Sequence, residues 1–239
     1  MATGVFLVTC EHGGNRIPAA YRHLFGAQRA LLATHRGHDA GALVMARSMS
    51  RALGAPLVWS TTSRLLVDLN RSIGQPRLFS AATRAAPRQL RSEIVEQHYR
   101  PYRAEVERRV RHAVARGRRV IHISSHSFTP VLDGAVRRAD VGLLYDPGRP
   151  HEVALCARWK SALSSLDRDL RVRRNYPYAG KGDGLAAYLR KQFDGNAYVG
   201  VELEVNQALV AGAPRAWSRL RARLIASLRT ALAAIGETG

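Results

Sequence analysis

Three short polar clusters in this sequence have the residue types needed to bind a metal ion and activate water. They are Glu11-His12-Gly13-Gly14-Asn15, Ser124-Ser125-His126-Ser127 and Glu202-Leu203-Glu204. A catalytic zinc ion takes about three ligands from His, Asp or Glu and keeps one position open for water, while a nearby carboxylate serves as general base. Together the clusters supply these parts, which indicates metal-assisted hydrolysis.

Two histidines are the best candidates for nitrogen ligands. His12 follows an apolar run, and the glycine pair after it lets the backbone approach a metal or a substrate closely. His126 stands at the exit of a predicted strand. Four extended residues, roughly 13 Å, separate it from His122, so the two cannot share an ion on a straight strand, and His122 is expected to line the core.

The acidic ligand is the least determined part of the predicted site. Asp39 is our candidate, although an acid at the start of a predicted helix is also a routine helix-stabilising residue. Glu11 is adjacent to His12, and neighbouring side chains on an extended backbone point to opposite sides, so we expect Glu11 to brace the loop. Glu11 and Asn15 remain alternatives for the third ligand.

Two acids on the last predicted strand compete for the role of general base. Glu202 and Glu204 have the same parity, so both face one side of the strand, where a buried acid needs a partner or a function. Arg64 and Arg71 flank Val67–Asn70, and a guanidinium binds a carboxylate through two parallel hydrogen bonds. The predicted partner is therefore a small acidic molecule.

The elements that must position these residues alternate between strands and helices. We expect strands at 4–10, 55–61, 63–69, 119–124, 140–145 and 198–205, and helices at 38–53, 92–116 with a restart at Pro101, 152–166, a short one ending at 192, and one from 214. Such alternation predicts an α/β domain whose mixed, mostly parallel sheet lies between helix layers. In such sheets, ligands bind beyond the carboxyl ends of the strands.

Composition restricts the remaining functional classes. The 239 residues, 46% of them hydrophobic, fit one domain spanning 1–239, and two distant cysteines give no disulfide framework. No stretch approaches a membrane span and no leader precedes the first strand, so we expect a soluble cytoplasmic protein. The net charge of +19 comes from dispersed arginines, which makes nucleic acid the minority interpretation.

Six segments, taken in order, resemble the N-formylglutamate amidohydrolase family. They are Cys10–Pro18, His38-Asp39 with Gly41, Ser63–Arg71, His126–Pro130, Asn175–Tyr178 and Val201–Gln207. The resemblance implies a three-layer α/β/α fold similar to that of the zinc carboxypeptidases, one zinc ion, and hydrolysis of N-formyl-L-glutamate to formate and L-glutamate. A related amidase acting on another acyl amino acid and a basic binding protein on an inactive scaffold are the alternatives.

The resemblance also implies roles for individual residues. His12, Asp39 and His126 would hold the metal, Asn15 standing where the zinc carboxypeptidase HxxE pattern has its acid. The family's closing E-I-R-Q-D-L string maps onto Glu204–Leu209, which favours Glu204 over Glu202 as the base. Asn206 and Ala208 depart from that string, so the substrate can differ from formylglutamate. Arg71, supported by Arg64, would bind the substrate carboxylate, with Asn175 and Tyr178 closing over it.

Overall fold

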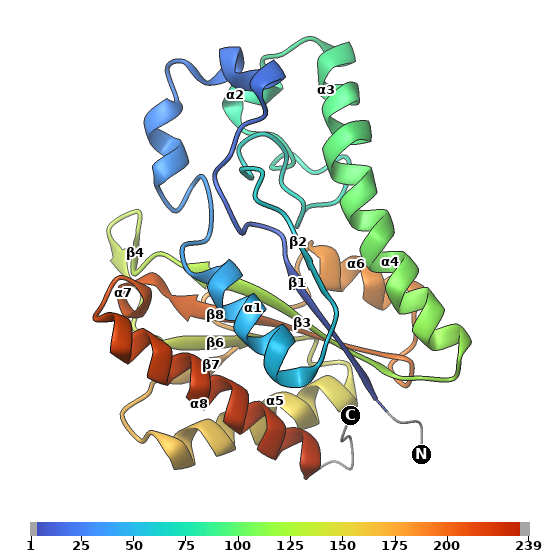
Figure 1. The fold of residues 1–239 in the computed structure, drawn as a ribbon, viewed down its shortest axis with the longest axis vertical. Helices are drawn as coiled ribbons and strands as arrows, with labels where there is room; N and C mark the ends of the chain where they lie inside the picture. Colours follow the sequence, from blue (N-terminus) through green and yellow to red (C-terminus); the bar gives the residue numbers. More distant parts are fainter. Residues whose placement is uncertain (1–3, 235–239) are drawn as a thin grey trace.

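A six-stranded sheet organises the computed structural model, which describes residues 4–234 (Figure 1). The sheet order is β2-β1-β3-β8-β6-β7, and all neighbours are parallel except β6 and β8. The strands are β1 Val5–Cys10, β2 Leu57–Trp59, β3 Val120–Phe128, β6 Val141–Leu144, β7 Val172–Arg174 and β8 Tyr198–Asn206. The prediction of a mixed, mostly parallel sheet is confirmed.

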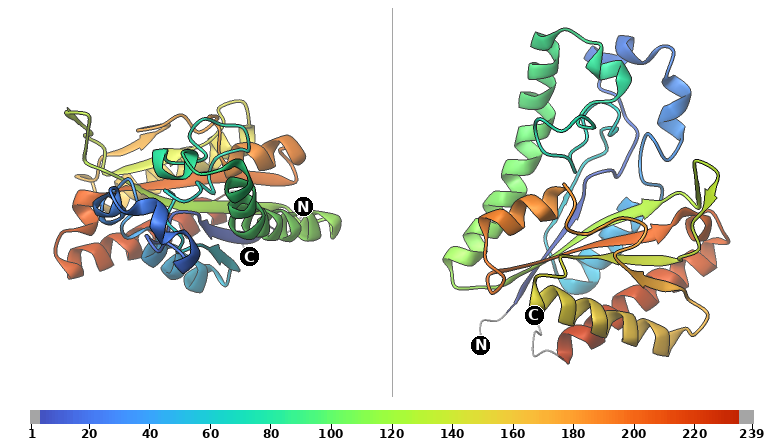
Figure 2. Two further views of the ribbon diagram at one scale, coloured as in Figure 1. Left: turned by 90° about the horizontal axis from the view of Figure 1, so that it is seen from above. Right: turned by 180° about the vertical axis from the view of Figure 1, so that it is seen from behind.

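Helices cover both faces of the sheet, as the two opposite views of Figures 1 and 2 show. One face packs against α1, α5 and α8 around Met45, Trp159 and Leu224, and the other against α4 and α6 around Val106 and Leu185. The helices are α1 Ala42–Leu53, α2 Ala81–Arg84, α3 Arg88–Ile94, α4 Arg100–Ala115, α5 Pro150–Leu166, α6 Leu185–Gln192, α7 Gln207–Val210 and α8 Pro214–Ala233, with 3₁₀ turns at Ala19–Phe25 and Arg29–Ala33. The three-layer α/β/α arrangement follows.

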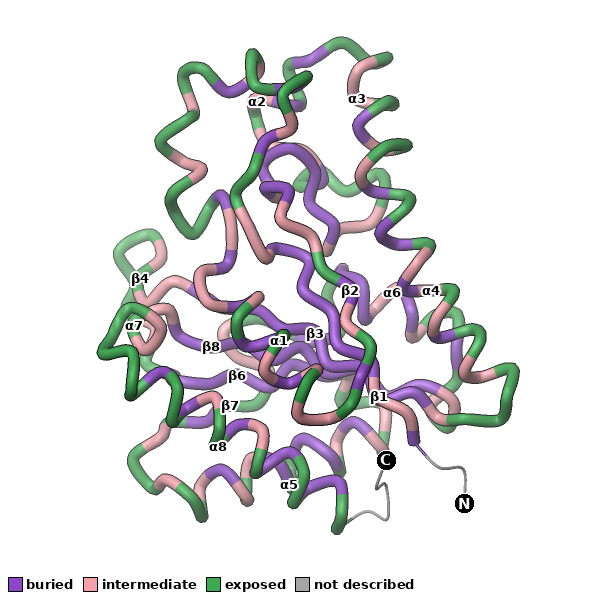
Figure 3. Tube along the Cα trace, viewed as in Figure 1, coloured by how far each residue is buried: buried purple, intermediate pink, exposed green. Residues whose placement is uncertain are grey.

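Strands β3 and β8 carry a polar stripe along one face of the sheet. Their parallel register sets Ser124 beside Glu202 and His126 beside Glu204. Because side chains alternate along a strand, the odd-numbered neighbours Ile123 and Leu203 face the α1–α5–α8 side instead. All nine residues of each strand are buried, and both strands are purple in Figure 3. The stripe is thus buried polar surface, which needs hydrogen-bond partners or a function.

Three predicted elements differ most from the structure, and the first is the helix predicted over 38–53, which begins only at Ala42. Residues 63–69 form turns rather than a strand: Leu66 N–H bonds to Ser63 O, and Asp68 N–H bonds to Leu78 O. Their apolar side chains are buried in the core on the α4 side of the sheet, although the segment pairs with no strand. The strand prediction was wrong because it rested on hydrophobicity alone. The helix predicted over 92–116 begins earlier, at Arg88, and a π turn at Val95–Tyr99 precedes the restart near Pro101.

The predicted domain bounds, the search for a membrane-spanning helix and a small hairpin complete the description of the fold. The domain expected over 1–239 includes residues 1–3 and 235–239, which lie outside the described range. Among residues 4–234, no helix is both long and apolar enough to cross a membrane. A small hairpin, β4 Val131–Leu132 and β5 Ala135–Val136, projects beyond the end of β3 (Figure 1). It extends the side of the sheet where β3 and β8 end.

Candidate functional site

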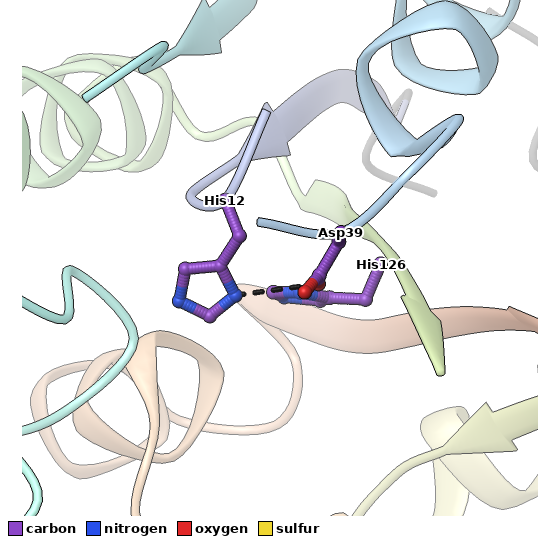
Figure 4. A group of neighbouring side chains, drawn as sticks. All are labelled: His12, Asp39 and His126. Atoms are coloured by element: carbon purple, nitrogen blue, oxygen red, sulfur yellow. Dashed lines mark hydrogen bonds and ion pairs between the residues drawn. The ribbon is translucent and has the colours of Figure 1, made fainter. Parts of the chain in front are cut away.

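His12, Asp39 and His126 converge from three separate segments of the chain (Figure 4). One ligand atom from each lies within 4.8 Å of the others. Asp39 Oδ2 is 2.8 Å from His126 Nδ1 and 3.3 Å from His12 Nδ1, so the two imidazoles present the same ring nitrogen to one carboxylate. All three side chains are buried. This group could hold one metal ion.

A local backbone contact brings His12 and Asp39 together. His12 follows the end of β1, and its carbonyl accepts a 2.9 Å hydrogen bond from Asp39 N–H. Asp39 precedes α1, whose N-cap is Gly41 at φ 78° with no side-chain cap, so the aspartate does not serve as a helix cap. A Cβ at Gly14 would lie 2.7 Å from Thr61 O. The glycine pair therefore lets the backbone pack closely against the segment that follows β2. We had expected these glycines to approach a metal or a substrate instead.

The outer nitrogen of each histidine meets a buried carboxylate. His12 Nε2 is 2.7 Å from Asp68 Oδ1, and His126 Nε2 is 3.0 Å from Glu11 Oε2. Metal-binding histidines characteristically donate their second N–H in this way, which fixes the tautomer and leaves the other nitrogen free for a metal. Glu11 also accepts hydrogen bonds from Ser124 Oγ at 2.6 Å and Tyr102 OH at 2.9 Å. It contacts His126, whereas we had expected it to brace the loop.

The electrostatics of the metal-free cluster follow from these contacts. Burial opposes the charged form of Glu11, but hydrogen bonding and attraction from His126 outweigh it and hold the pKa of Glu11 far below its usual value. Burial likewise opposes protonation of His126, but hydrogen bonds to Asp39 and Glu11 raise its pKa well above the ordinary value. Without a metal, the neighbouring carboxylates favour the protonated imidazole of His126, and a divalent cation would compete with that proton.

Glu204 lies beside this cluster and differs from the other buried acids. It is 5% exposed, and its Oε2 has no hydrogen-bond partner among residues 4–234. Burial raises its pKa to about 8; His126 opposes the shift, while Asp39 and Glu202 add to it. Glu202 is also buried, which raises its pKa, but it accepts a hydrogen bond from Asn70. The free carboxylate oxygen therefore belongs to Glu204.

The two predicted arginines occupy different surroundings. Arg64 bonds to Asp68 Oδ2 through Nη2 at 2.7 Å and Nε at 3.1 Å, and its Nη1 lies 3.3 Å from Asp39 Oδ1. Its guanidinium is thus engaged with two carboxylates of the cluster. Arg71 donates from Nη1 to Asp183 O at 2.6 Å, while its buried Nε has no partner among the described residues. Of the two, Arg71 retains the freer guanidinium.

The three remaining predicted residues lie outside the ligand cluster. Asn15 is exposed on the segment after the glycine pair. Asn175, at φ 50°, accepts hydrogen bonds at Oδ1 from Tyr145 N–H and Gly180 N–H, so its side chain shapes its own loop. Tyr178 is 46% exposed, and its hydroxyl accepts a 2.9 Å hydrogen bond from Arg137 Nη1. Of these three residues, only Tyr178 connects the loop after β7 to the segment that follows the β4–β5 hairpin.

Comparison with known proteins decides the family. Residues 4–211 match the family model described as N-formylglutamate amidohydrolase. The chain belongs to the N-formylglutamate amidohydrolase family. This membership supports hydrolase activity on an amide bond and confirms the resemblance seen in the sequence. No curated protein matches the chain.

Solved structures support the fold of this family member. The Agrobacterium tumefaciens gene product Atu2144 is 29% identical with a TM-score of 0.85, covering 99% of this chain and 93% of that one. N-formylglutamate amidohydrolase from Ralstonia eutropha JMP134 is 20% identical with a TM-score of 0.66, covering 97% and 94%, a likeness that shows the fold alone. A Burkholderia cenocepacia metallo-carboxypeptidase aligns with a TM-score of only 0.38 at 12% identity, covering 99% and 58%, which is too distant to support an argument.

The site of this amidohydrolase family member includes residues that we did not single out from the sequence. Asp68 contacts His12 and Arg64, while Asn70 Nδ2 lies 3.5 Å from His126 Nε2 and Asn70 Oδ1 accepts a 2.7 Å hydrogen bond from Leu185 N–H. Both lie between Arg64 and Arg71, within a segment that carries the family resemblance. Their position in this segment was the only sequence feature that could have identified them. The incorrect strand prediction at 63–69 gave no reason to expect either side chain to face the histidines.

Proposed function

We propose that this protein hydrolyses the amide bond of a small N-acyl amino acid in a zinc-dependent reaction, with N-formyl-L-glutamate as the first candidate substrate. The observation that carries the proposal is the buried, unpartnered Oε2 of Glu204 beside a cluster of two histidines and one aspartate. Such a carboxylate is poised to accept a proton. Family membership supplies the reaction class.

His12, Asp39 and His126 would hold the metal. Two imidazoles and one carboxylate are a donor set that catalytic zinc uses, and the buried carboxylates at both outer nitrogens fit the surroundings of such ligands. Arg64, paired with Asp39 and Asp68, would keep those two carboxylates oriented. A zinc ion in this position would acidify water and polarise an amide carbonyl.

Glu204 would move the proton that the reaction requires. Water adds to the acyl carbon, the carbon–nitrogen bond breaks, and the departing nitrogen must gain the proton that the water loses. A carboxylate at Glu204 takes this proton and delivers it to the amine, so the products are formate or another carboxylate and a free amino acid. The raised pKa of Glu204, about 8 without a metal, makes its carboxyl group a strong proton acceptor once ionised.

Recognition of an acidic substrate would fall to groups around the cluster. Arg71 is the proposed contact for the substrate carboxylate, because its Nε has no partner among the described residues, with Arg64 in support. Tyr178 would cover the substrate from the loop after β7, which Asn175 shapes. Asn15 is the proposed contact on the side of His12, since it is exposed and three residues beyond it.

A related amidase acting on another acyl amino acid is the second candidate, and one observation favours it. Asn206 stands where the family resemblance leads us to expect arginine. Its Oδ1 caps α7 by accepting from Ala208 N–H, and its Nδ2 donates to Ala139 O at 2.9 Å. This side chain stabilises the chain locally and brings no positive charge to a substrate. The acidic side chain of glutamate would therefore have one cation fewer to bind.

One screen tests both candidates. Zinc-loaded protein would be incubated with N-formyl, N-acetyl and longer N-acyl derivatives of glutamate, aspartate and neutral amino acids, and carboxylate and amine release would be measured in parallel. N-formyl-L-glutamate as the best substrate would support the first candidate. A different acyl group or amino acid would support the second, and no release from any compound, with zinc bound, would contradict both.

A further inference from the structure

A cavity of about 490 Å³ lies on the α4 and α6 side of the molecule, apart from the residues of the proposed metal centre. Its lining includes Ile73, Tyr99, Arg100, Arg103, Glu107 and Tyr188. Its volume lies within the range typical of small-molecule sites. Neither the metal cluster nor the proposed substrate contacts use any of these residues.

Arg103 gives this cavity its chemical character. It is only 6% exposed, and its guanidinium lies 5.4 Å from the ring centre of Tyr99 and 4.6 Å from that of Tyr188. Among residues 4–234, it forms no ion pair within 4 Å, and its one hydrogen bond runs from Nη1 to Leu69 O at 3.2 Å. A buried guanidinium without a direct ion pair keeps hydrogen-bond donors available for an anion.

The acid that lines the cavity attracts Arg103 but makes its direct contacts elsewhere. Glu107 forms an ion pair with Arg111 and accepts a 2.7 Å hydrogen bond from Tyr188 OH. Arg100 lies at the same cavity and adds a second positive charge, although it is exposed and paired with Glu96. Ile73, 52% exposed, and the two tyrosine rings supply apolar surface. The lining therefore combines a guanidinium that no carboxylate among the described residues contacts directly with flat apolar walls.

We propose that this cavity is a second binding site, for a small organic carboxylate with an apolar or aromatic body. The carboxylate would bind the free edge of the Arg103 guanidinium, which suits two parallel hydrogen bonds, while the body would contact Ile73 and the tyrosine rings. Hydrogen bonds to charged groups are stronger than those between neutral groups. Loss of the arginine should therefore weaken binding at least tenfold.

The site is connected to the catalytic cluster through one short backbone segment. Tyr99 OH donates to Arg71 O at 2.7 Å, and Arg103 donates to Leu69 O, so both hold the chain next to Asp68 and Asn70. Those two residues contact His12 and His126 respectively. A ligand between α4 and α6 would thus lie against two residues that hold this segment in place.

The test uses 4-fluorobenzoate as the probe and the metal-free full chain, so that the carboxylate cannot bind a metal. Titration followed by ¹⁹F NMR and calorimetry should give saturable binding, which Arg103→Met weakens at least tenfold and Arg108→Met leaves unchanged. Arg108 is a matched control because it lies on the same helix, is exposed and is paired with Glu105. No saturation at millimolar probe, or equal affinity in Arg103→Met, would overturn the proposal.

Three further variants keep the test decisive if Arg103→Met does not fold. Ile73→Glu adds a negative charge at an exposed position of the cavity and should also weaken binding at least tenfold, whereas Val44→Glu, at 47% exposure on α1, should not. His12→Ala should bind the probe as the unchanged protein does. If Ile73→Glu binds normally, or His12→Ala loses the probe, the ligand occupies another site and the proposal is wrong.

Discussion

Replacing Glu204 by glutamine should lower activity and raise the stability of the metal-free protein. Glutamine keeps the shape of the side chain but can neither ionise nor accept the proton of water as a base. The carboxyl is 5% exposed with an unpartnered oxygen, and burial raises its pKa from 4.5 to about 8. The folded state therefore disfavours the very charge that the proposed mechanism requires.

The size of the stability effect follows from this pKa. Because the pKa is higher in the folded than in the unfolded state, the contribution of this group is fully present below pH 4.5 and is lost as the pH rises through about 8. The loss amounts to roughly 4–5 kcal/mol above pH 8 and about 3 kcal/mol at pH 7. Glutamine does not titrate, so metal-free Glu204→Gln should be the more stable protein by a few kcal/mol at pH 8.

Two assays measure these effects on the same preparations. Denaturant unfolding in the presence of a chelator, at pH 5 and pH 8, gives the change in the free energy of unfolding. Turnover of the zinc-loaded protein should fall about a hundred- to ten-thousand-fold, the usual contribution of a general base. Glu202→Gln is the matched control and should retain turnover. If metal-loaded Glu204→Gln turns over normally while Glu202→Gln does not, the roles of the two acids must be exchanged.

Three further predictions concern other groups. Asp68→Asn should weaken zinc binding about 10- to 100-fold in competition with a chromophoric chelator, because it removes the carboxylate at His12 Nε2; unchanged affinity would refute this role. Burial lowers the pKa of His122 to about 4, so stability should fall by roughly 3 kcal/mol as the pH drops from 6.5 to 4. Unfolding of His122→Gln should lack this dependence, and an identical pH profile would contradict it. Binding to duplex DNA should be weak and vanish with modest salt, whereas tight binding at physiological salt in a filter assay would overturn that view.

Periodicity alone predicted much of the arrangement around the site. The shared parity of Glu202 and Glu204 indicated one face, and the register of β3 and β8 places both beside polar residues of β3. The roughly 13 Å predicted between His122 and His126 also agrees with their separate partners: His122 bonds to Thr9 and Tyr198, away from Asp39. These features are local to strands, where side-chain direction follows from sequence position.

Contacts that depend on irregular backbone could not be predicted in the same way. Residues 63–69 are apolar enough for a strand, yet turns hold them, and those turns aim Asp68 at His12. Glu11 offers a similar case, since its partners Tyr102 and Ser124 lie about a hundred residues away in the chain. No spacing rule links such distant residues, and only the folded backbone brings them together.

Hydrogen-bond satisfaction separates the buried acids of this protein by role. Glu152 accepts from Asp146 N–H, Gly200 N–H and Arg190, and Asp68 accepts from Arg64, Asn70 N–H and His12, so both acids stabilise the fold around them. Glu204 alone among the described acids has a buried oxygen without a partner. Burying a carboxylate in this way costs stability, and a structural role would not require it. A proton acceptor in a water-activating site does require an oxygen free to meet the water, and for that reason we propose Glu204 rather than Glu202 for the proton transfer.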